Sequence, residues 1–323
     1  ARERRRGRAS AALAAGLAAG LLVYLYLPLA AAGDPPVNWG NPRTLDGLWW
    51  LVSGQLYQGF AFAVAWSDVP GRLAGWSAEL WRSFLPWGMA AALLGLATLF
   101  QRNRPLAAAL SVSLLLGLVW AIGYNTSDSL LSLLSGWVIV ALALGAGLTA
   151  ALDWLAGWNR RAALAAALLA IALAAAPLIL YWQGQNLRDD QAAEQFYSQV
   201  LRHAPADAVL LTAGDRATFA LWYGRYGLGL RPDVTPVSRD LWALPSYRAT
   251  VASQHPDLAG PAPPAAWLDL LQAVRQQRPL YLAQAGLADP PRANGDQPVP
   301  AVPGYRPELV LQGDGWALWR LDR

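Results

Sequence analysis

Long stretches without any charged side chain alternate with short charged clusters along the first 190 residues. Five such stretches lie between the charged residues at positions 8 and 34, 82 and 102, 104 and 128, 128 and 153, and 161 and 188. A helix needs about 20 predominantly apolar residues to cross a bilayer. Soluble helices do not explain the pattern, because none of the five would have a polar face. We therefore predict a multi-pass bundle of five transmembrane helices, at about residues 9–32, 83–101, 105–125, 130–152 and 162–182.

A sixth uncharged stretch, from residue 47 to 67, competes with this assignment. Its centre holds five polar or small residues, namely Ser53, Gly54, Gln55, Tyr57 and Gln58. Such groups are costly on a helix that faces lipid. We predict instead that the stretch forms helices lying in the membrane interface, with Trp49, Trp50 and Trp66 at headgroup depth.

Three basic clusters, at residues 2–8, 102–104 and 160–161, indicate the orientation of the helices. Arginine accumulates on the cytoplasmic side of membrane proteins. Five crossings that start in the cytoplasm place all three clusters inside. The loop 33–82 and everything after the last helix, residues 183–323, are then predicted to be extracytoplasmic, and the localisation to be the plasma membrane.

The pattern after residue 183 becomes that of a soluble domain in which helices and strands alternate. The expected elements are a helix at 190–202, a strand at 207–212, a helix at 216–226, a strand near 237, a helix at 265–276, a strand at 279–283, and a hairpin of 308–312 with 316–321 around a Gly-Asp-Gly turn. The proline-rich stretches 256–264 and 290–303 are expected to be loops. We predict a small α/β domain.

Composition narrows the possible functions. Only 14% of the 323 residues are charged, against about 25% in an ordinary soluble domain. The net charge of +4 resides in the membrane part, since residues 183–323 hold 13 Arg against 14 Asp and Glu. No nucleic-acid partner is therefore expected. Cysteine is absent, and His203 and His255 are too few for a histidine-rich centre, so no residue is assigned as a metal ligand and no bound cofactor is predicted, while dependence on a divalent metal stays open. The chain starts at Ala1 and its only methionine is Met89, from which we expect a C-terminal part of a longer protein.

The first predicted external loop carries the strongest candidate site. Residues 33–42 contain three Pro and two Gly, which favour a rigid, non-helical path, and Thr44 can cap a short helix over 45–53. A carboxylate, amides, an indole and a guanidinium converge on this path, supplied by Asp34, Asn38, Trp39, Asn41 and Arg43. A purely structural interfacial loop is the alternative.

Two further acidic residues are candidates with structural alternatives. Asp128 lies at the predicted outer membrane boundary, where a short solvated turn explains it equally well. Asp215 lies where a strand meets a helix, a frequent ligand position in α/β sheets, but it can also be the N-cap of the following helix. His203 and His255 are expected to be surface residues near helix ends.

Several motifs resemble those of a known membrane family. They are Tyr24-Leu-Tyr-Leu-Pro-Leu, Pro35-Pro-Val-Asn-Trp-Gly-Asn-Pro, Thr44, Trp49-Trp50, Ser53-Gly-Gln-Leu-Tyr57, Gly123-Tyr-Asn-Thr-Ser-Asp128, Gly214-Asp215, Leu221-Trp-Tyr223, Arg231-Pro-Asp-Val234 and Tyr247. The chain resembles protein O-mannosyltransferase-like proteins long catalogued as a domain of unknown function, within the GT-C class of membrane glycosyltransferases. On these motifs Tyr57, Tyr223 and Arg231 join the candidate residues.

The resemblance implies a transferase that takes a sugar from a polyprenyl-phosphate carrier on the outer membrane face and passes it to a protein or glycan acceptor. The family's acidic motif, an Asp-Ser-Gly-Glu-like tetrapeptide in the first external loop, does not occur in this sequence. The catalytic acid is therefore expected outside this chain. Arg43 or Arg82 is expected to neutralise the carrier phosphate.

Two other classes of function remain open. One is a membrane-anchored binding or assembly protein whose outer α/β domain recognises a partner without catalysis. The other, a transporter, is less favoured, because the predicted helices contain no buried charge and transport pathways usually include ionisable residues within the membrane.

Overall fold

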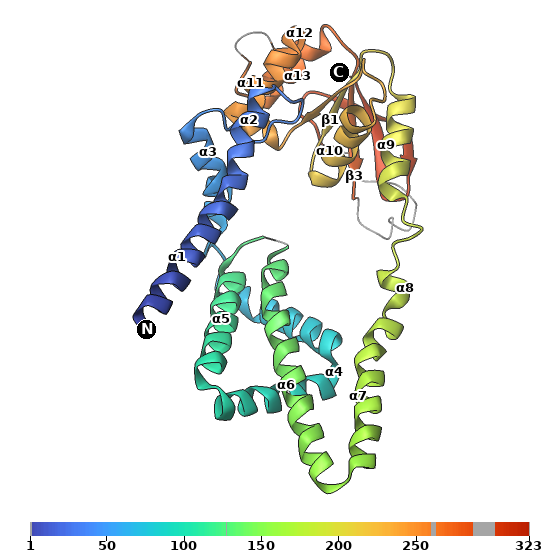
Figure 1. Ribbon diagram of the computed structural model, residues 1–323. Coiled ribbons are helices and arrows are strands. Elements are labelled where there is room, and N and C mark those ends of the chain that lie inside the picture. Colours follow the sequence, from blue (N-terminus) through green and yellow to red (C-terminus); the bar gives the residue numbers. More distant parts are fainter. Residues whose placement is uncertain (1, 127, 260–262, 287–300, 323) are drawn as a thin grey trace. The chain divides into compact units, whose positions relative to one another are not determined.

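The chain folds into two compact units. The computed structural model describes residues 2–126, 128–259, 263–286 and 301–322, with the side chains of these residues from position 10 onward except that of Ala259 (Figure 1). One unit comprises residues 1–55 and 190–323, and the other comprises residues 56–189. This division differs from the predicted boundary at 182/183, because the residues around position 35 contact the C-terminal domain, where Gln254 donates to the Pro35 carbonyl oxygen.

Unit 56–189 is helical. Its elements are η2 (Gln55–Phe60), α4 (Val69–Arg102), α5 (Arg104–Gly123), η3 (Ser129–Leu133), α6 (Leu134–Trp158), α7 (Arg160–Leu180) and α8 (Trp182–Gln185). A single asparagine connects α4 to α5 and another connects α6 to α7. The Oδ1 of Asn103 accepts from the backbone N of Leu106, 3.3 Å away, and that of Asn159 accepts from Arg161 at 2.9 Å. Each asparagine thereby caps the helix that follows it.

Five helices in the described residues are long and apolar enough to cross a membrane. They are Ser10–Ala32, Val69–Arg102, Arg104–Gly123, Ser129–Trp158 and Arg160–Leu180. This confirms five apolar helices at the predicted places and indicates a membrane-associated protein. The competing segment 47–67 does not form one long helix, since α3 (Leu45–Val52) ends before Gly54, which has a φ of +63°.

Helix α4 begins earlier than the predicted span at 83–101. It starts at Val69, so the predicted loop 33–82 ends at residue 68. Hydropathy alone missed this start, because Arg72, Glu79 and Arg82 interrupt the apolar run although they are compatible with a helix. The two parts of α4 meet at a kink, where Leu85 has a φ of +58° directly before Pro86.

Helices α4 and α6 approach each other closely at small residues. A Cβ atom added to Gly95 would lie 1.7 Å from the carbonyl oxygen of Ala143, and one added to Gly147 would lie 1.9 Å from that of Ala91. Each helix thus presents an alanine and a glycine four positions apart to the backbone of the other. This is the small-residue packing common between membrane helices.

Unit 1–55 with 190–323 contains a mixed five-stranded sheet. Its strands are β1 (Val209–Thr212), β2 (Thr235–Ser238), β3 (Leu280–Ala285), β4 (Arg306–Gly313) and β5 (Trp316–Asp322), in the order β2-β1-β3-β5-β4. Strand β1 pairs in parallel with β2 and β3, whereas β5 is antiparallel to β3 and β4. The predicted strands and the C-terminal hairpin are confirmed.

Helices cover both faces of this sheet (Figure 1). They are α9 (Ala192–His203), α10 (Asp215–Trp222) with its π-helical extension η4 (Tyr223–Gly227), η5 (Leu241–Ala243), α11 (Pro245–Gln254), α12 (Pro256–Ala259) and α13 (Trp267–Arg275). Adjacent residues of strand β1 point to opposite faces of the sheet and so pack in different hydrophobic cores. Leu210 packs with Phe196 and Ala217 from α9 and α10, and Leu211 packs in the core that contains α11, α12 and α13.

The helices differ from the predictions at two places. Helix α11 was not predicted, and α12 occupies the start of the stretch 256–264 that was expected to be a loop. Both helices begin with a proline, which is favourable at the first helical position because its missing N–H has no intrahelical partner there. Of the other predicted loop, 290–303, only residues 301–303 are described, and they are not helical or extended.

The N-terminal residues of this unit form α1 (Arg2–Leu21), η1 (Leu22–Leu25), α2 (Tyr26–Ala32) and α3. The predicted cap of α3 is confirmed, since Thr44 Oγ1 accepts from the backbone N of Gly47 at 3.1 Å. Residues 33–43 run between α2 and α3 without regular structure. They carry five of the predicted site residues.

Candidate functional site

An ion pair holds the two ends of the segment 33–43 together. Arg43 Nη2 contacts Asp34 Oδ1, and Arg43 Nε donates to the carbonyl oxygen of Ala31 at 2.9 Å. Arg43 is thereby fixed at the C-terminal end of the first apolar helix. The side chains of Asp34 and Arg43 remain 64% and 38% exposed, so both can still meet a ligand.

The middle of the segment is a tight turn that depends on left-handed backbone. Gly40 and Asn41 have φ values of +70° and +44°, and Asn38 Nδ2 donates to Asn41 Oδ1 at 3.0 Å across the turn. A Cβ at Gly40 would lie 2.8 Å from the ring of Trp50, so α3 leaves no space for a side chain here. The structure brings four predicted residues, Asp34, Asn38, Asn41 and Arg43, into one short loop.

This loop packs against the α/β domain. Residues 37–40, including Trp39, face Trp222, Leu241 and Tyr247 across a space of about 10 Å³. That is no more than about one water can occupy, so the contact is packed and is not a ligand pocket. Gln254 Nε2 adds a hydrogen bond of 3.0 Å to the carbonyl oxygen of Pro35. Trp39 is therefore a packing residue that joins loop and domain.

Tyr57 and Asp128 lie in the other unit. Asp128 is exposed and precedes η3 without capping it, as the solvated-turn alternative expected. Its neighbours form a polar cluster around Arg72, which donates to Tyr124 O at 2.7 Å, Ser129 Oγ at 3.1 Å and Asn125 Oδ1 at 3.2 Å. Sequence reasoning missed Arg72, because it lies 52 positions before its first partner.

Asp215 is not the N-cap of α10. Gly214, with a φ of +79°, occupies that position, and Asp215 is the exposed first residue of the helix. The Gly214 backbone N donates instead to Asp240 Oδ2 at 2.7 Å. A glycine is favourable here because a positive φ places strain on any residue with a Cβ. Asp215 still lies in the first turn, where a carboxylate interacts well with the helix dipole.

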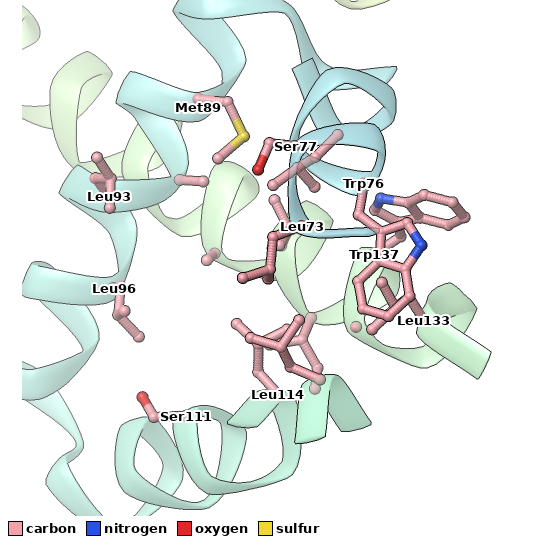
Figure 2. Close-up of a pocket in the computed structure, with 17 residues that line it drawn as sticks. Leu73, Trp76, Ser77, Met89, Leu93, Leu96, Ser111, Leu114, Leu133 and Trp137 are labelled. Carbon is pink, nitrogen blue, oxygen red and sulfur yellow. The ribbon is translucent and has the colours of Figure 1, made fainter. Parts of the chain in front are cut away.

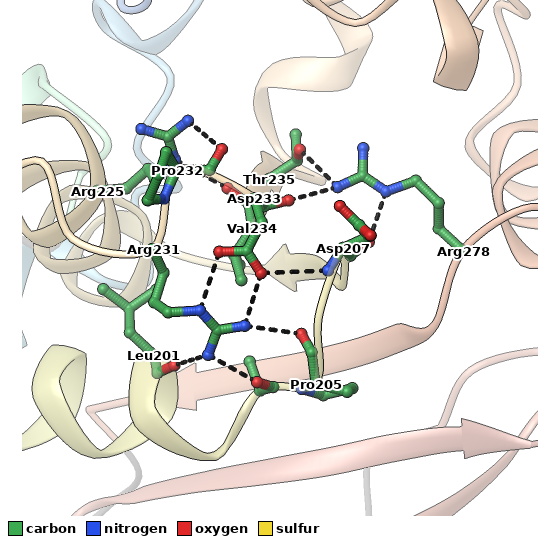
Figure 3. Close-up of polar contacts among 11 residues, drawn as sticks. Leu201, Pro205, Asp207, Arg225, Arg231, Pro232, Asp233, Val234, Thr235 and Arg278 are labelled. Atoms are coloured by element: carbon green, nitrogen blue, oxygen red, sulfur yellow. Dashed lines mark hydrogen bonds and ion pairs between the residues drawn. The ribbon is translucent and has the colours of Figure 1, made fainter.

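Arg231 belongs to a polar cluster that fastens loops together (Figure 3). Its guanidinium donates to the carbonyl oxygens of Leu201 at 2.7 Å, Ala204 at 2.8 Å and Pro205 at 3.0 Å, and it pairs with Asp233 at 2.7 Å. All three guanidinium nitrogens are thus engaged within the domain, and we leave Arg231 out of the candidate site.

Two more arginines complete this cluster. Arg225 donates to the carbonyl oxygen of Val234 at 3.0 Å, and Arg278 donates to that of Asp233 at 2.8 Å. The hydrogen bond from Arg231 and other contacts hold the pKa of Asp233 well below its ordinary value. The cluster fixes the residues just before β1 and β2, which is a structural role.

The remaining titratable candidates have local explanations. His203 is the exposed last residue of α9, as predicted, and its Nδ1 lies 2.9 Å from the Gln199 carbonyl oxygen. His255 also lies at a helix end but is partly buried, contrary to the prediction, and this burial lowers its pKa. Burial raises the pKa of the Tyr247 hydroxyl, which accepts from the Ser238 backbone N at 2.9 Å. Tyr223 is 56% exposed and its ring meets Tyr197 edge-on.

An apolar cavity of about 330 Å³ lies between α4, α5 and α6 (Figure 2). Leu73, Trp76, Leu114 and Trp137 are among the side chains that line it. The hydroxyl of Ser111 also faces this cavity, and it is buried without a hydrogen-bond partner in the described part of the chain. Size and apolar walls suit a hydrocarbon chain.

No family model matches this sequence, and no curated protein or solved structure is significantly similar to it. The fold therefore defines the class of protein: a membrane-associated protein with five long apolar helices and a small domain built on a mixed five-stranded sheet. Its relation to membrane glycosyltransferases stays a prediction from the sequence motifs.

Proposed function

We propose that this protein is part of a membrane glycosyltransferase that uses a polyprenyl-phosphate sugar, and that the loop 33–43 contributes to the donor site. The observation that carries the proposal is the placement of Arg43. Its side chain is tied to Ala31, the second-last residue of the first apolar helix, and to Asp34, yet it stays 38% exposed. A lipid-linked phosphate is located at this depth, where an apolar helix meets the aqueous phase.

The side chains of the loop suit the sugar-phosphate head group of a lipid-linked donor. A guanidinium binds phosphate oxygens through charge-assisted hydrogen bonds. In the described residues Arg43 uses Nε and Nη2 for its partners, which leaves Nη1 available to a ligand. The amide of Asn38 stands in the same loop and suits a sugar hydroxyl. Asp34 holds the guanidinium in place, and no residue of this chain is assigned as the catalytic acid.

The remainder of the chain is compatible with such a donor. The basic clusters at 2–8, 102–104 and 160–161 favour a cytoplasmic location for these ends, and hence an extracytoplasmic loop 33–43 and C-terminal domain. Reaction at the outer face requires no nucleotide-binding fold, because the lipid carrier delivers the activated sugar.

Sugar transfer can be measured directly. The protein carrying this chain is expressed in cells that lack it, and membranes are supplied with polyprenyl-phosphate [¹⁴C]mannose or [¹⁴C]glucose. We expect label in protein or glycan, and a loss of about tenfold or more for Arg43→Ala, the equivalent of one charge-assisted hydrogen bond. Asn38→Ala is expected to reduce transfer less. Arg320→Ala is the matched control, since Arg320 is also an exposed, ion-paired arginine of the same unit.

The outcomes separate the candidate functions. Normal transfer by Arg43→Ala at equal protein level would show that the loop is only a scaffold. No transfer from either donor by the wild-type protein would favour the membrane-anchored binding protein. A decrease shared by Arg320→Ala would indicate a general loss of folded protein and would contradict the assigned role of Arg43.

A further inference from the structure

Four large apolar side chains are exposed close together on the α/β domain. Phe219 on α10, Tyr223 on η4, and Leu228 and Leu230 just after it are 48%, 56%, 47% and 40% exposed. We call these four residues the α10 patch. Single exposed apolar residues are ordinary, but a cluster marks a surface that meets something apolar.

The backbone keeps the α10 patch together. Phe219 and Tyr223 are four positions apart and hence on one helix face. The Leu228 N donates to Tyr223 O at 2.9 Å and the Leu230 N to Gly224 O at 3.0 Å, so the chain folds back beside the end of η4. On the other face of α10, Ala217 and Leu221 are fully buried in the core. The patch is therefore the outer surface of a well-packed helix.

We propose that the α10 patch docks onto the membrane surface and holds the α/β domain against the lipid headgroups. The first reason is its position in the unit. The ring of Phe219 lies 5.7 Å from that of Trp222, and Trp222 lines the contact with loop residues 37–40. Val37 is only five residues beyond Ala32, where the first apolar helix ends, and five residues reach at most about 18 Å. The patch thus lies close to the point where the chain leaves the bilayer.

Helix α3, which directly follows the loop 33–43, presents a second apolar face. Leu45, Trp49 and Val52 are spaced by four and three positions along α3, and they are 85%, 70% and 41% exposed. Trp50, on another side of α3, packs against Gly40 of the loop. The loop therefore connects the first apolar helix to two surfaces that both present aromatic and aliphatic side chains, the composition that lies at headgroup depth in membrane proteins.

The chemistry of the patch indicates apolar insertion without a need for anionic lipid. Arg216, three positions before Phe219, lies with its side chain against Gly286, just after β3. Arg225, the basic residue nearest in sequence to Tyr223, donates to the carbonyl oxygens of Val234 and Pro232 and lies over the ring of Tyr226. It is therefore occupied within the domain. We expect docking on neutral phosphatidylcholine, with no requirement for phosphatidylglycerol and little sensitivity to salt. This inference does not depend on sugar transfer.

The absence of cysteine allows a clean test in the whole protein. Single substitutions Phe219→Cys, Tyr223→Cys and Glu308→Cys are spin-labelled, and the protein is placed in phosphatidylcholine bilayers. Glu308 is the control, because it is exposed on β4, at the sheet edge opposite β2. Collisions with oxygen, which is concentrated in lipid, are compared with collisions with a water-soluble nickel chelate.

We expect labels at 219 and 223 to collide more with oxygen than with the nickel chelate, and the label at 308 to show the opposite order. In the Phe219→Asp variant, the label at 223 is expected to collide more with the nickel chelate than with oxygen, and this result would add support. Labels at 219 and 223 that meet the nickel chelate as freely as the label at 308 would overturn the proposal. Labels that meet neither reagent would also overturn it, since they would indicate that a protein covers the patch.

Discussion

The close crossing of α4 and α6 predicts that one added methyl group will separate these two apolar helices. In Gly95→Ala the new Cβ would lie 1.7 Å from the carbonyl oxygen of Ala143, and in Gly147→Ala 1.9 Å from that of Ala91. Real Cβ atoms essentially never come closer than 3.0 Å to a non-bonded heavy atom of a residue elsewhere in the chain. The obstructing atoms are backbone, so no side chain can rotate away, and the helices must move apart by more than 1 Å at the crossing.

The energetic cost follows from this separation. Overpacking in a tight core costs about 1–3 kcal/mol, and the loss of close helix contact adds to it. The gain in helix propensity from glycine to alanine, about 0.5–1 kcal/mol, is too small to offset this cost. We therefore expect Gly95→Ala and Gly147→Ala to lower the thermal stability of the helical unit, and the double substitution to cost less than the sum because one separation relieves both contacts.

Two glycines of the same bundle provide the controls. No heavy atom of the described residues lies within 4 Å of the position that an added Cβ would occupy at Gly145 on α6 or at Gly117 on α5, so alanine there meets open space. Thermal unfolding in one detergent, followed by tryptophan fluorescence, compares all four single variants. We expect Gly145→Ala and Gly117→Ala to match or exceed the wild-type Tm. Equal Tm values for Gly147→Ala and Gly145→Ala would refute the crossing.

Three further changes test the polar contacts. The pKa of Asp233 is lowered in the folded protein, so its ionised carboxylate stabilises the fold at pH values above the unfolded pKa of about 3.9. This contribution is lost as the pH falls towards the folded pKa. Asp233→Asn is therefore expected to lower the Tm at pH 7 and to make the Tm fall less steeply below pH 5. Tyr247→Phe leaves the Ser238 backbone N without its acceptor, at a cost of about 1–3 kcal/mol in the free energy of unfolding measured with denaturant. Arg72→Ala removes three hydrogen bonds around Asn125 and is expected to speed amide hydrogen exchange at residues 124–129, whereas unchanged exchange would show that this turn is held by its own backbone.

Periodicity and charge predicted most of the fold, because they reflect local physics. Uncharged stretches marked the five apolar helices, and short apolar runs next to turn residues marked strands of the C-terminal domain. The start of α4 was missed for a related reason: a helix requires backbone hydrogen bonds and tolerates Arg72 and Glu79, whereas a hydropathy window does not. Helix α11 was missed because its sequence, Pro245–Gln254, has little helical periodicity and is fixed by its packing.

The candidate site was predictable only in part. The density of Pro, Gly and Asn in residues 33–42 revealed a rigid loop with polar side chains. Its attachment to the α/β domain was not predictable, since Pro35 and Gln254 are 219 positions apart and no local pattern connects them. The same limit explains Arg231, whose motif suggested a functional role although its partners, such as Leu201, lie about 30 residues away.

Energy also helps to decide whether the loop 33–43 is only structural. An exposed ion pair such as Asp34 with Arg43 contributes about 0–1 kcal/mol. Asp34 and Asn41 both adopt a positive φ, at +50° and +44°, a conformation that Asp and Asn tolerate better than other residues with a Cβ. Because the ion pair adds so little to stability while leaving both side chains accessible, Arg43→Ala is expected to leave the Tm nearly unchanged, and its effect on sugar transfer is the measurement that distinguishes a donor site from an interfacial loop.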